Sequence, residues 1–153
     1  MTEVSIPNAE AMEHEATRFV LSLLPKAIEA TLITLQGDLG AGKTAFVKGI
    51  GRALGVAERI TSPTFVIMKI YDLEGQRFSR LIHIDAYRLK GEHHLKVLGW
   101  DDLLSDPQNL ICMEWPEQAG NALPESAIRM VFRYSGEYGR TITYENSETV
   151  STT

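Results

Sequence analysis

The sequence predicts a single α/β domain, and three observations support this prediction. The chain has 153 residues, which is the size of one ordinary domain. A short run rich in β-branched residues, 30–36, leads into a glycine-rich loop and then into a segment whose apolar residues have helical spacing. A second apolar run, 110–113, has the pattern of a strand buried on both faces, which is typical of α/β sheets. Strand, loop and helix therefore follow one another as in an α/β unit.

The composition excludes several classes of protein. Hydrophobic residues make up 44% of the chain and charged residues 23%, as in soluble globular proteins. The net charge of -5 argues against a broad basic face that could grip a nucleic-acid backbone. The single cysteine, Cys112, excludes an internal disulfide framework and a cysteine-based zinc site. No segment resembles a secretion signal or is long enough to span a membrane, so we expect a cytoplasmic protein with no membrane partner.

Helices are expected where apolar residues recur every three or four positions. Asn8 can cap the first helix, which ends near Pro25, and Gly55 can cap the second. The three expected helical segments are 8–25, 43–54 and 91–104, the last of which is interrupted at Gly99.

Strands are expected in short β-branched or alternating runs bounded by turn residues. These runs are 30–36, 66–73, 80–85, 110–113, 127–134 and 140–144. Turn residues at 74–76 and 135–139 join two pairs of these strands as hairpins. We therefore expect one domain at 1–145, followed by a polar, disordered tail at 146–153.

The segment 37–44 reads Gly-Asp-Leu-Gly-Ala-Gly-Lys-Thr and matches the P-loop pattern G-x-x-x-x-G-K-[ST]. Its glycines let backbone N–H groups approach phosphate oxygens at the N-terminus of a helix. Lys43 is expected to reach the β and γ phosphates, and the Thr44 hydroxyl to bind Mg²⁺. The alternative, a glycine turn that only caps the helix, does not explain a lysine followed by a threonine. The residues expected to contact the nucleotide are Asp38, Leu39, Gly40, Ala41, Gly42, Lys43, Thr44, Ala45 and Trp115.

Two carboxylates are candidates for the acidic group that a P-loop needs at the end of a neighbouring strand. Asp85 ends one apolar run and Glu114 ends another, so both would lie at the sheet edge where open α/β sheets bind ligands. Such a group holds or orients Mg²⁺ and its waters. Either carboxylate could orient the water that attacks the γ-phosphate, and a solvated loop residue is the alternative for each.

Several further residues have two interpretations. Ser62 and Thr64 lie in a loop where many P-loop proteins sense the γ-phosphate, although a polar turn also fits. Trp115 follows Glu114 and either packs near the nucleotide or belongs to the core. His83 is expected to be a partly buried, hydrogen-bonded histidine rather than a catalytic base. The chain lacks the Asn-Lys-x-Asp segment that reads guanine in GTPases, so ATP is the expected nucleotide.

Four motifs occur together in this chain: the P-loop at 37–44, Ser-Pro-Thr-Phe at 62–65, His-Ile-Asp-Ala-Tyr-Arg-Leu at 83–89 and Glu-Trp-Pro at 114–116. In this order and spacing the chain resembles the TsaE (YjeE) family, small bacterial ATPases required for making threonylcarbamoyladenosine in tRNA. The resemblance implies a central mixed, partly parallel sheet flanked by helices. It also implies Mg²⁺ binding by Thr44 and Glu114, a place near the γ-phosphate for Asp85, a switch-like role for 62–64, and a place near the nucleotide for Trp115. The expected catalytic residues are Lys43, Thr64, Asp85 and Glu114.

The same resemblance implies two protein partners, TsaB and TsaD. ATP hydrolysis by family members is thought to reset that complex between rounds of threonylcarbamoyl transfer. The chemistry on tRNA would belong to TsaD, so this chain would meet tRNA only indirectly. The sequence departs from the expected pattern at 98–102, Leu-Gly-Trp-Asp-Asp, where a glutamate-rich and less aromatic segment is expected.

Two other functions also fit a P-loop in a chain of this size. A small-molecule or nucleotide kinase shares the glycine spacing, but such kinases usually close an arginine-bearing lid over the phosphates, and no arginine-rich insert is present. A nucleotide-sensing binding module would change its affinity for partners with the bound nucleotide, without a need for hydrolysis.

Overall fold

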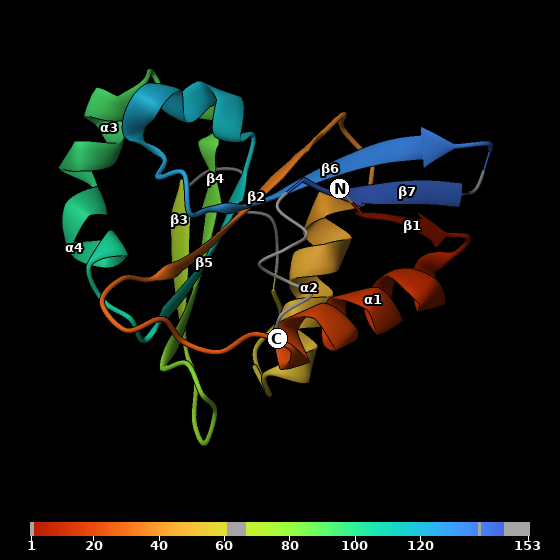
Figure 1. Cartoon of the computed structure of the whole chain (residues 1–153), viewed down its shortest axis with the longest axis horizontal. Coiled ribbons are helices and arrows are strands. Elements are labelled where there is room, and N and C mark those ends of the chain that lie inside the picture. The colour runs from red at the N-terminus through yellow and green to blue at the C-terminus, as the bar shows by residue number, and fades with distance from the viewer. Residues whose placement is uncertain (1, 61–66, 138, 146–153) are drawn as a thin grey trace.

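A seven-stranded mixed sheet with helices on both faces forms the described part of the chain (Figure 1). The computed structural model describes residues 2–60, 67–137 and 139–145, so Ser62, Thr64 and the expected tail at 146–153 lie outside the described residues. The strand order is β1-β7-β6-β2-β5-β4-β3. The strands are β1 (Thr2–Ile6), β2 (Thr31–Gly37), β3 (Met68–Asp72), β4 (Arg80–Asp85), β5 (Asn109–Glu114), β6 (Ile128–Ser135) and β7 (Gly139–Tyr144).

Four α-helices and two 3₁₀ helices connect these strands in the described ranges. They are α1 (Ala9–Leu21), α2 (Lys43–Ala53), η1 (Ala86–Arg88), α3 (Glu92–Val97), α4 (Trp100–Leu104) and η2 (Pro116–Ala122). The Asn8 side chain accepts a hydrogen bond of 2.9 Å from the N–H of Ala11, which confirms the predicted cap of the first helix. The predicted interruption at Gly99 is also confirmed, because it separates α3 from α4.

The centre of the sheet is parallel and its two edges are antiparallel. β2 pairs in parallel with both β5 and β6, and β5 pairs in parallel with β4. β3 joins β4 as a hairpin, and β6, β7 and β1 continue the other side in antiparallel fashion. The prediction of a mixed, partly parallel sheet is confirmed. The parallel pairing also brings the carboxyl ends of β2, β4 and β5 to one edge of the sheet.

The strand β1 was not expected from the sequence. It lies at the edge of the sheet and pairs only with β7 among the described residues. The run is only five residues long and has two apolar residues, Val4 and Ile6, of which only Ile6 is buried, so its strand signal is short. The expected strand 66–73 is also shorter in the structure, where β3 covers Met68–Asp72 and Val66 lies outside the described residues.

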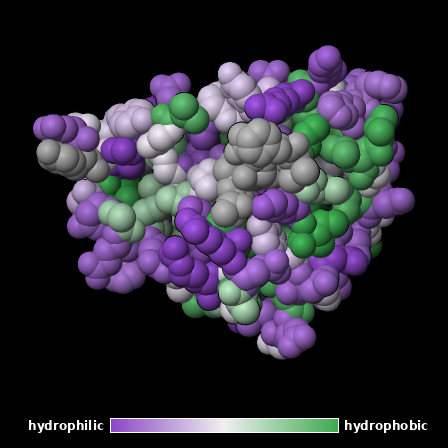
Figure 2. Space-filling view, turned by 180° about the vertical axis from the view of Figure 1, so that it is seen from behind, coloured by the Kyte–Doolittle hydropathy of each residue, from purple (hydrophilic) through white to green (hydrophobic). Residues whose placement is uncertain are grey.

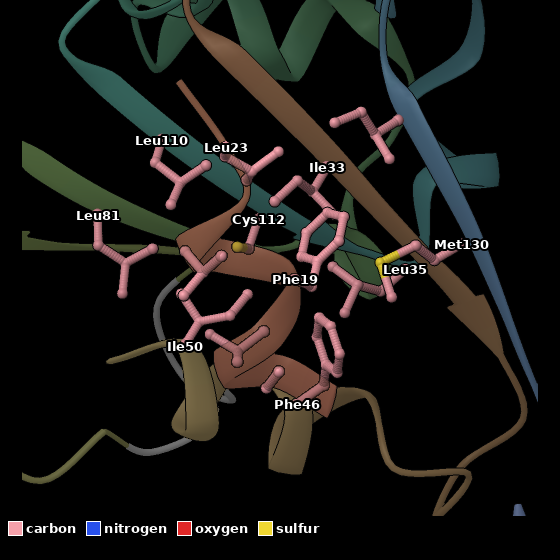
Figure 3. Close-up of a cluster of buried hydrophobic side chains, with 14 of the residues drawn as sticks. Phe19, Leu23, Ile33, Leu35, Phe46, Ile50, Leu81, Leu110, Cys112 and Met130 are labelled. Carbon is pink, nitrogen blue, oxygen red and sulfur yellow. The ribbon is translucent and has the colours of Figure 1, made fainter. Parts of the chain in front are cut away.

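Two apolar cores cover the two faces of the sheet. Between the sheet and helices α1 and α2, the rings of Phe19 and Phe46 lie 5.8 Å apart among aliphatic side chains from β2, β4, β5 and β6 (Figure 3). Cys112 belongs to this core and is fully buried, and burial raises the pKa of its thiol. The opposite core lies beneath α3, α4 and η2 and includes Trp100. A helix layer thus packs against each face, as expected for an α/β domain.

The surface is largely hydrophilic in the view of Figure 2, with apolar side chains gathered toward the side of the molecule that carries α3 and α4. In the described ranges, no helix has the length and apolar character needed to cross a bilayer.

Helices α1 and α2 approach each other closely at Gly49. A Cβ atom added at Gly49 would lie 2.7 Å from the Cβ of Ala16, so neither helix leaves room for a side chain here. The close contact fixes α2, whose first residues belong to the P-loop, against α1.

We predict that Gly49→Val lowers the free energy of unfolding by about 1–3 kcal/mol, the usual cost of overpacking a core. Valine has a better helix propensity than glycine, so a lower free energy of unfolding would come from the contact with Ala16 and not from a weaker helix. Urea denaturation measures the change. Adding Ala16→Gly to the same chain should recover part of the loss, and an unchanged midpoint in Gly49→Val would contradict the predicted contact.

Candidate functional site

The P-loop connects the end of β2 to the first turn of α2. Gly42 precedes α2 with a φ of 106°, and a Cβ atom there would lie 2.5 Å from the Met12 side chain, so only glycine fits this position without strain. In the part of the chain that the structure describes, no side chain caps the helix at Gly42. The backbone N–H groups of the first turn of α2 could therefore bind an anionic ligand.

Lys43 is nearly buried, with 4% of its surface exposed, and its ammonium is held inside the P-loop. Its Nζ atom donates to the carbonyl oxygen of Gly37 and lies 3.5 Å from the centroid of the Trp115 ring. Desolvation lowers the pKa of Lys43, and the negative charges of Glu114, Glu117, Asp85 and Asp38 oppose this shift. The site therefore holds a costly positive charge that phosphate oxygens could compensate.

Thr44 and Glu114 meet at the centre of the site. The Thr44 hydroxyl lies 3.1 Å from both carboxylate oxygens of Glu114 and donates to this group. Glu114 is 4% exposed and lies at the end of β5. A hydroxyl beside a carboxylate is a pair of hard oxygen ligands, which fits Mg²⁺ bound by few protein groups together with phosphate and water. The described residues contain no cluster of three or more His, Cys, Asp or Glu suited to an all-protein metal cage.

Asp85 lies beside Glu114, because the two residues are register partners at the ends of β4 and β5. Its Oδ1 atom accepts a hydrogen bond of 3.0 Å from the N–H of Tyr87 and so caps η1. The side chain is only half-buried. The structure therefore brings both predicted carboxylates to one edge, next to the P-loop.

Trp115 leaves β5 in a left-handed backbone conformation, with a φ of 59° and a ψ of 52°. The backbone N–H of Trp115 donates to the carbonyl oxygen of Leu35 at 3.3 Å, which connects the turn to β2. The ring lies against the Lys43 ammonium and contacts the ring of Tyr87 edge to face, with 5.1 Å between centroids. The ring also packs against the core beneath α3 and α4, as the core interpretation of Trp115 expects, whereas its place near a nucleotide stays a prediction.

His83 was expected to be partly buried, but its side chain is completely buried. Its Nε2 atom lies 2.6 Å from Glu114 Oε2, whereas Nδ1 has no hydrogen-bond partner among the described residues. The expectation was therefore wrong about burial and right about one of the two ring nitrogens. Alternation along an apolar strand gave no sign of the contact with Glu114, since the pairing of β4 with β5 creates it.

Sequence reasoning missed two residues that contact the backbone of the P-loop. Tyr134 Oη donates to the carbonyl oxygen of Leu39 at 2.7 Å, and Arg140 Nε lies 3.4 Å from that of Gly40. The Arg140 guanidinium also lies 4.4 Å from the centroid of the Tyr134 ring. Both residues belong to the β6–β7 hairpin, which reaches the loop because β6 pairs with β2. The sequence carried no local signal for this contact.

A strand leads into a glycine loop, Lys43 and Thr44 start the following helix, and an acidic residue ends the neighbouring parallel strand. These features define the fold of the P-loop NTPases. The family model described as "Threonylcarbamoyl adenosine biosynthesis protein TsaE" matches residues 6–142. The chain therefore belongs to the TsaE family.

Individual proteins support the same assignment. The tRNA threonylcarbamoyladenosine biosynthesis protein TsaE of Bacillus subtilis is 36% identical over 113 residues, which cover 74% of this chain and 68% of the relative. The protein with the same name from Treponema pallidum is 36% identical over 115 residues, covering 75% of this chain and 82% of the relative. The crystal structure of Bacillus subtilis YdiB superimposes with a TM-score of 0.70 at 27% identity, covering 94% of this chain and 83% of YdiB.

We predict that Lys43→Met raises the free energy of unfolding of the nucleotide-free protein at neutral pH. The pKa of Lys43 is lowered below its ordinary value of 10.5, so the folded state disfavours the charged form. This penalty is fully present below the folded-state pKa. The penalty is lost as the pH rises from the folded-state pKa through 10.5. Over this pH range, the difference in free energy of unfolding between Lys43→Met and the wild type should therefore narrow. Denaturant titrations across pH measure the gap.

Lys48→Met removes a lysine from the same helix and serves as the matched control for this measurement. A Lys43→Met variant that is less stable than the wild type at neutral pH would contradict a net desolvation cost.

Proposed function

We propose that this chain binds ATP and Mg²⁺ at the P-loop and hydrolyses ATP to ADP and phosphate in the cytoplasm. The activity would serve the formation of threonylcarbamoyladenosine in tRNA, together with the partners TsaB and TsaD. Hydrolysis would reset that complex between turnovers, and tRNA would meet this chain only through the complex. Membership of the TsaE family supports the pathway, and the site supports the chemistry.

The contact between Thr44 and Glu114 is the observation that carries the ATPase proposal. It joins the start of α2 to the end of β5 at the place where the P-loop would hold the phosphates. Bound Mg²⁺ supplies positive charge to the β and γ phosphates at this point. The Thr44 hydroxyl and the Glu114 carboxylate are the protein groups that would hold it.

The remaining residues have roles that follow from their positions. Lys43 would leave the carbonyl of Gly37 to bind the β and γ phosphates, which relieves the cost of its buried charge. Asp85 accepts the N–H of Tyr87 with Oδ1, and its second oxygen would orient the attacking water. Trp115 would keep one side of the phosphate site dry. For Thr64, a γ-phosphate-sensing role remains a prediction from the sequence.

We predict that the purified protein releases phosphate from ATP slowly alone and faster when TsaB and TsaD are added. Lys43→Ala should reduce the rate by about 100-fold or more, because it removes the charge that stabilises the transferring phosphoryl group. A colorimetric phosphate assay measures both effects. Unchanged turnover in Lys43→Ala would contradict the assignment of the site.

Two other outcomes of this assay would favour the alternative functions. If no phosphate is released with or without the partners while ATP still binds, a nucleotide sensor or a kinase that lacks its acceptor would be favoured. Retained regulation of the partners by Glu114→Gln, in a form that binds ATP without hydrolysing it, would favour the sensor.

We also predict that ATP binding changes the fluorescence of Trp115. The chain has two tryptophans, and the other, Trp100, is buried with its Nε1–H donating to the carbonyl of Ala122 at 3.1 Å. Movement of the Lys43 ammonium from the Trp115 ring toward phosphate changes the charge beside that ring only. Emission should therefore stay sensitive to ATP in Trp100→Phe and lose this sensitivity in Trp115→Phe. The reverse result would place the nucleotide elsewhere.

A further inference from the structure

His83 is a completely buried polar residue to which the roles above assign nothing. It lies in β4 between Ile82 and Ile84, whose side chains point to the opposite face of the sheet. A buried imidazole is expensive unless its nitrogen atoms have hydrogen-bond partners. This one has a single partner among the described residues, the carboxylate of Glu114, and its Nδ1 atom has none. The position of His83 is therefore explained by Glu114 and by no other polar group described.

A carboxylate that binds Mg²⁺ must be ionised, and an ionised carboxylate only accepts hydrogen bonds. With Glu114 in that state, the hydrogen lies on His83 Nε2, which donates it to Glu114 Oε2 over 2.6 Å. The His83 ring is enclosed, and it sits on a strand that is paired on both sides. It therefore offers Glu114 a donor that cannot move far.

A donor in a fixed position is useful to Glu114, because a positive charge in the site also attracts its carboxylate. The ammonium of Lys43 attracts the Glu114 carboxylate, and a glutamate side chain has enough rotatable bonds to turn toward it. Thr44 approaches the carboxylate from α2, and His83 approaches it from β4. Two donors on different elements hold a carboxylate plane better than one, because each blocks rotation about the other contact.

We propose that His83 is a positioning residue that holds the Glu114 carboxylate beside the Thr44 hydroxyl, in the orientation that binds the Mg²⁺ of the nucleotide complex. The inference rests on the proposed binding of ATP with Mg²⁺ at this site. It assigns to His83 no contact with nucleotide or metal, and no proton transfer. Loss of the donor would weaken the binding of Mg²⁺ and leave the part of nucleotide binding that does not depend on the metal.

Two variants at His83 separate the donor from the ring. In His83→Gln the side-chain amide can place an N–H near the position of Nε2, whereas His83→Leu fills similar space without a donor. A fluorescent, non-hydrolysable ATP analogue is bound to each protein while Mg²⁺ is titrated. Metal-free binding of the analogue, measured in the presence of a chelator, is the internal control. We expect His83→Leu to raise the Mg²⁺ concentration for half-saturation about 10-fold or more, the usual effect of removing a partner of a metal ligand, with metal-free binding unchanged.

His83→Gln should recover most of the Mg²⁺ response that His83→Leu loses. An unchanged Mg²⁺ response in His83→Leu would overturn the proposal, and so would an equal loss in both variants, because the donor would then be irrelevant. Failure of the wild type to bind the analogue in a Mg²⁺-dependent way would overturn the proposed function instead, so the two failures are distinguishable.

Two further measurements keep the proposal testable if His83→Leu does not fold. His83→Asn retains a polar amide that is too short to reach Glu114, and it should show the same loss of Mg²⁺ response. In the wild-type protein without nucleotide, ¹⁵N spectra of labelled histidine should show the hydrogen of His83 on Nε2, and Glu114→Gln should shift that signal. A hydrogen on Nδ1 alone would contradict the donation to Glu114.

Discussion

Parallel pairing of β5 with both β2 and β4 is the constraint on which the whole site depends. It aligns Leu35 with Glu114 and Glu114 with Asp85, so the chain turns into the P-loop directly beside the two carboxylates. Because side chains alternate along a strand, a slip of one residue would turn Glu114 to the opposite face of the sheet. Thr44 would then face an apolar side chain. The buried register of the central strands therefore determines the geometry of the candidate site as well as the fold.

The same arrangement brings several energetically unfavourable features together in one small region. A lysine ammonium is nearly buried, a carboxylate lies 4% exposed beside it, and a tryptophan adopts a left-handed backbone conformation between them and η2. Functional sites commonly contain such destabilising features, and the surrounding structure must offset their free-energy cost. Here the two apolar cores do so, since the strands that carry Glu114 and Asp85 are buried on both faces.

Local patterns predicted most of the fold and much of the site. The P-loop, the cap at Asn8 and the interruption at Gly99 depend on residues close together in the chain, and the structure agrees at each. The two carboxylates were predictable because each ends an apolar strand. What could not be predicted depends on pairing between distant segments. Edge strand β1 has one buried residue, and the contact of His83 with Glu114 exists only once β4 lies beside β5. Tyr134 and Arg140 meet the P-loop only because β6 pairs with β2.

The close packing of α1 against α2 has a mechanical consequence. The Ala16 side chain packs directly against the backbone at Gly49, so α2 cannot slide along α1 without separating from it. The layer of α1 and α2 therefore acts as a fixed support for the P-loop. The other layer is built from short pieces that begin at the site itself, since Asp85 caps η1 and Trp115 directly precedes η2. In the proposed function, a difference between ATP and ADP at the site would therefore reach η1 and η2 first.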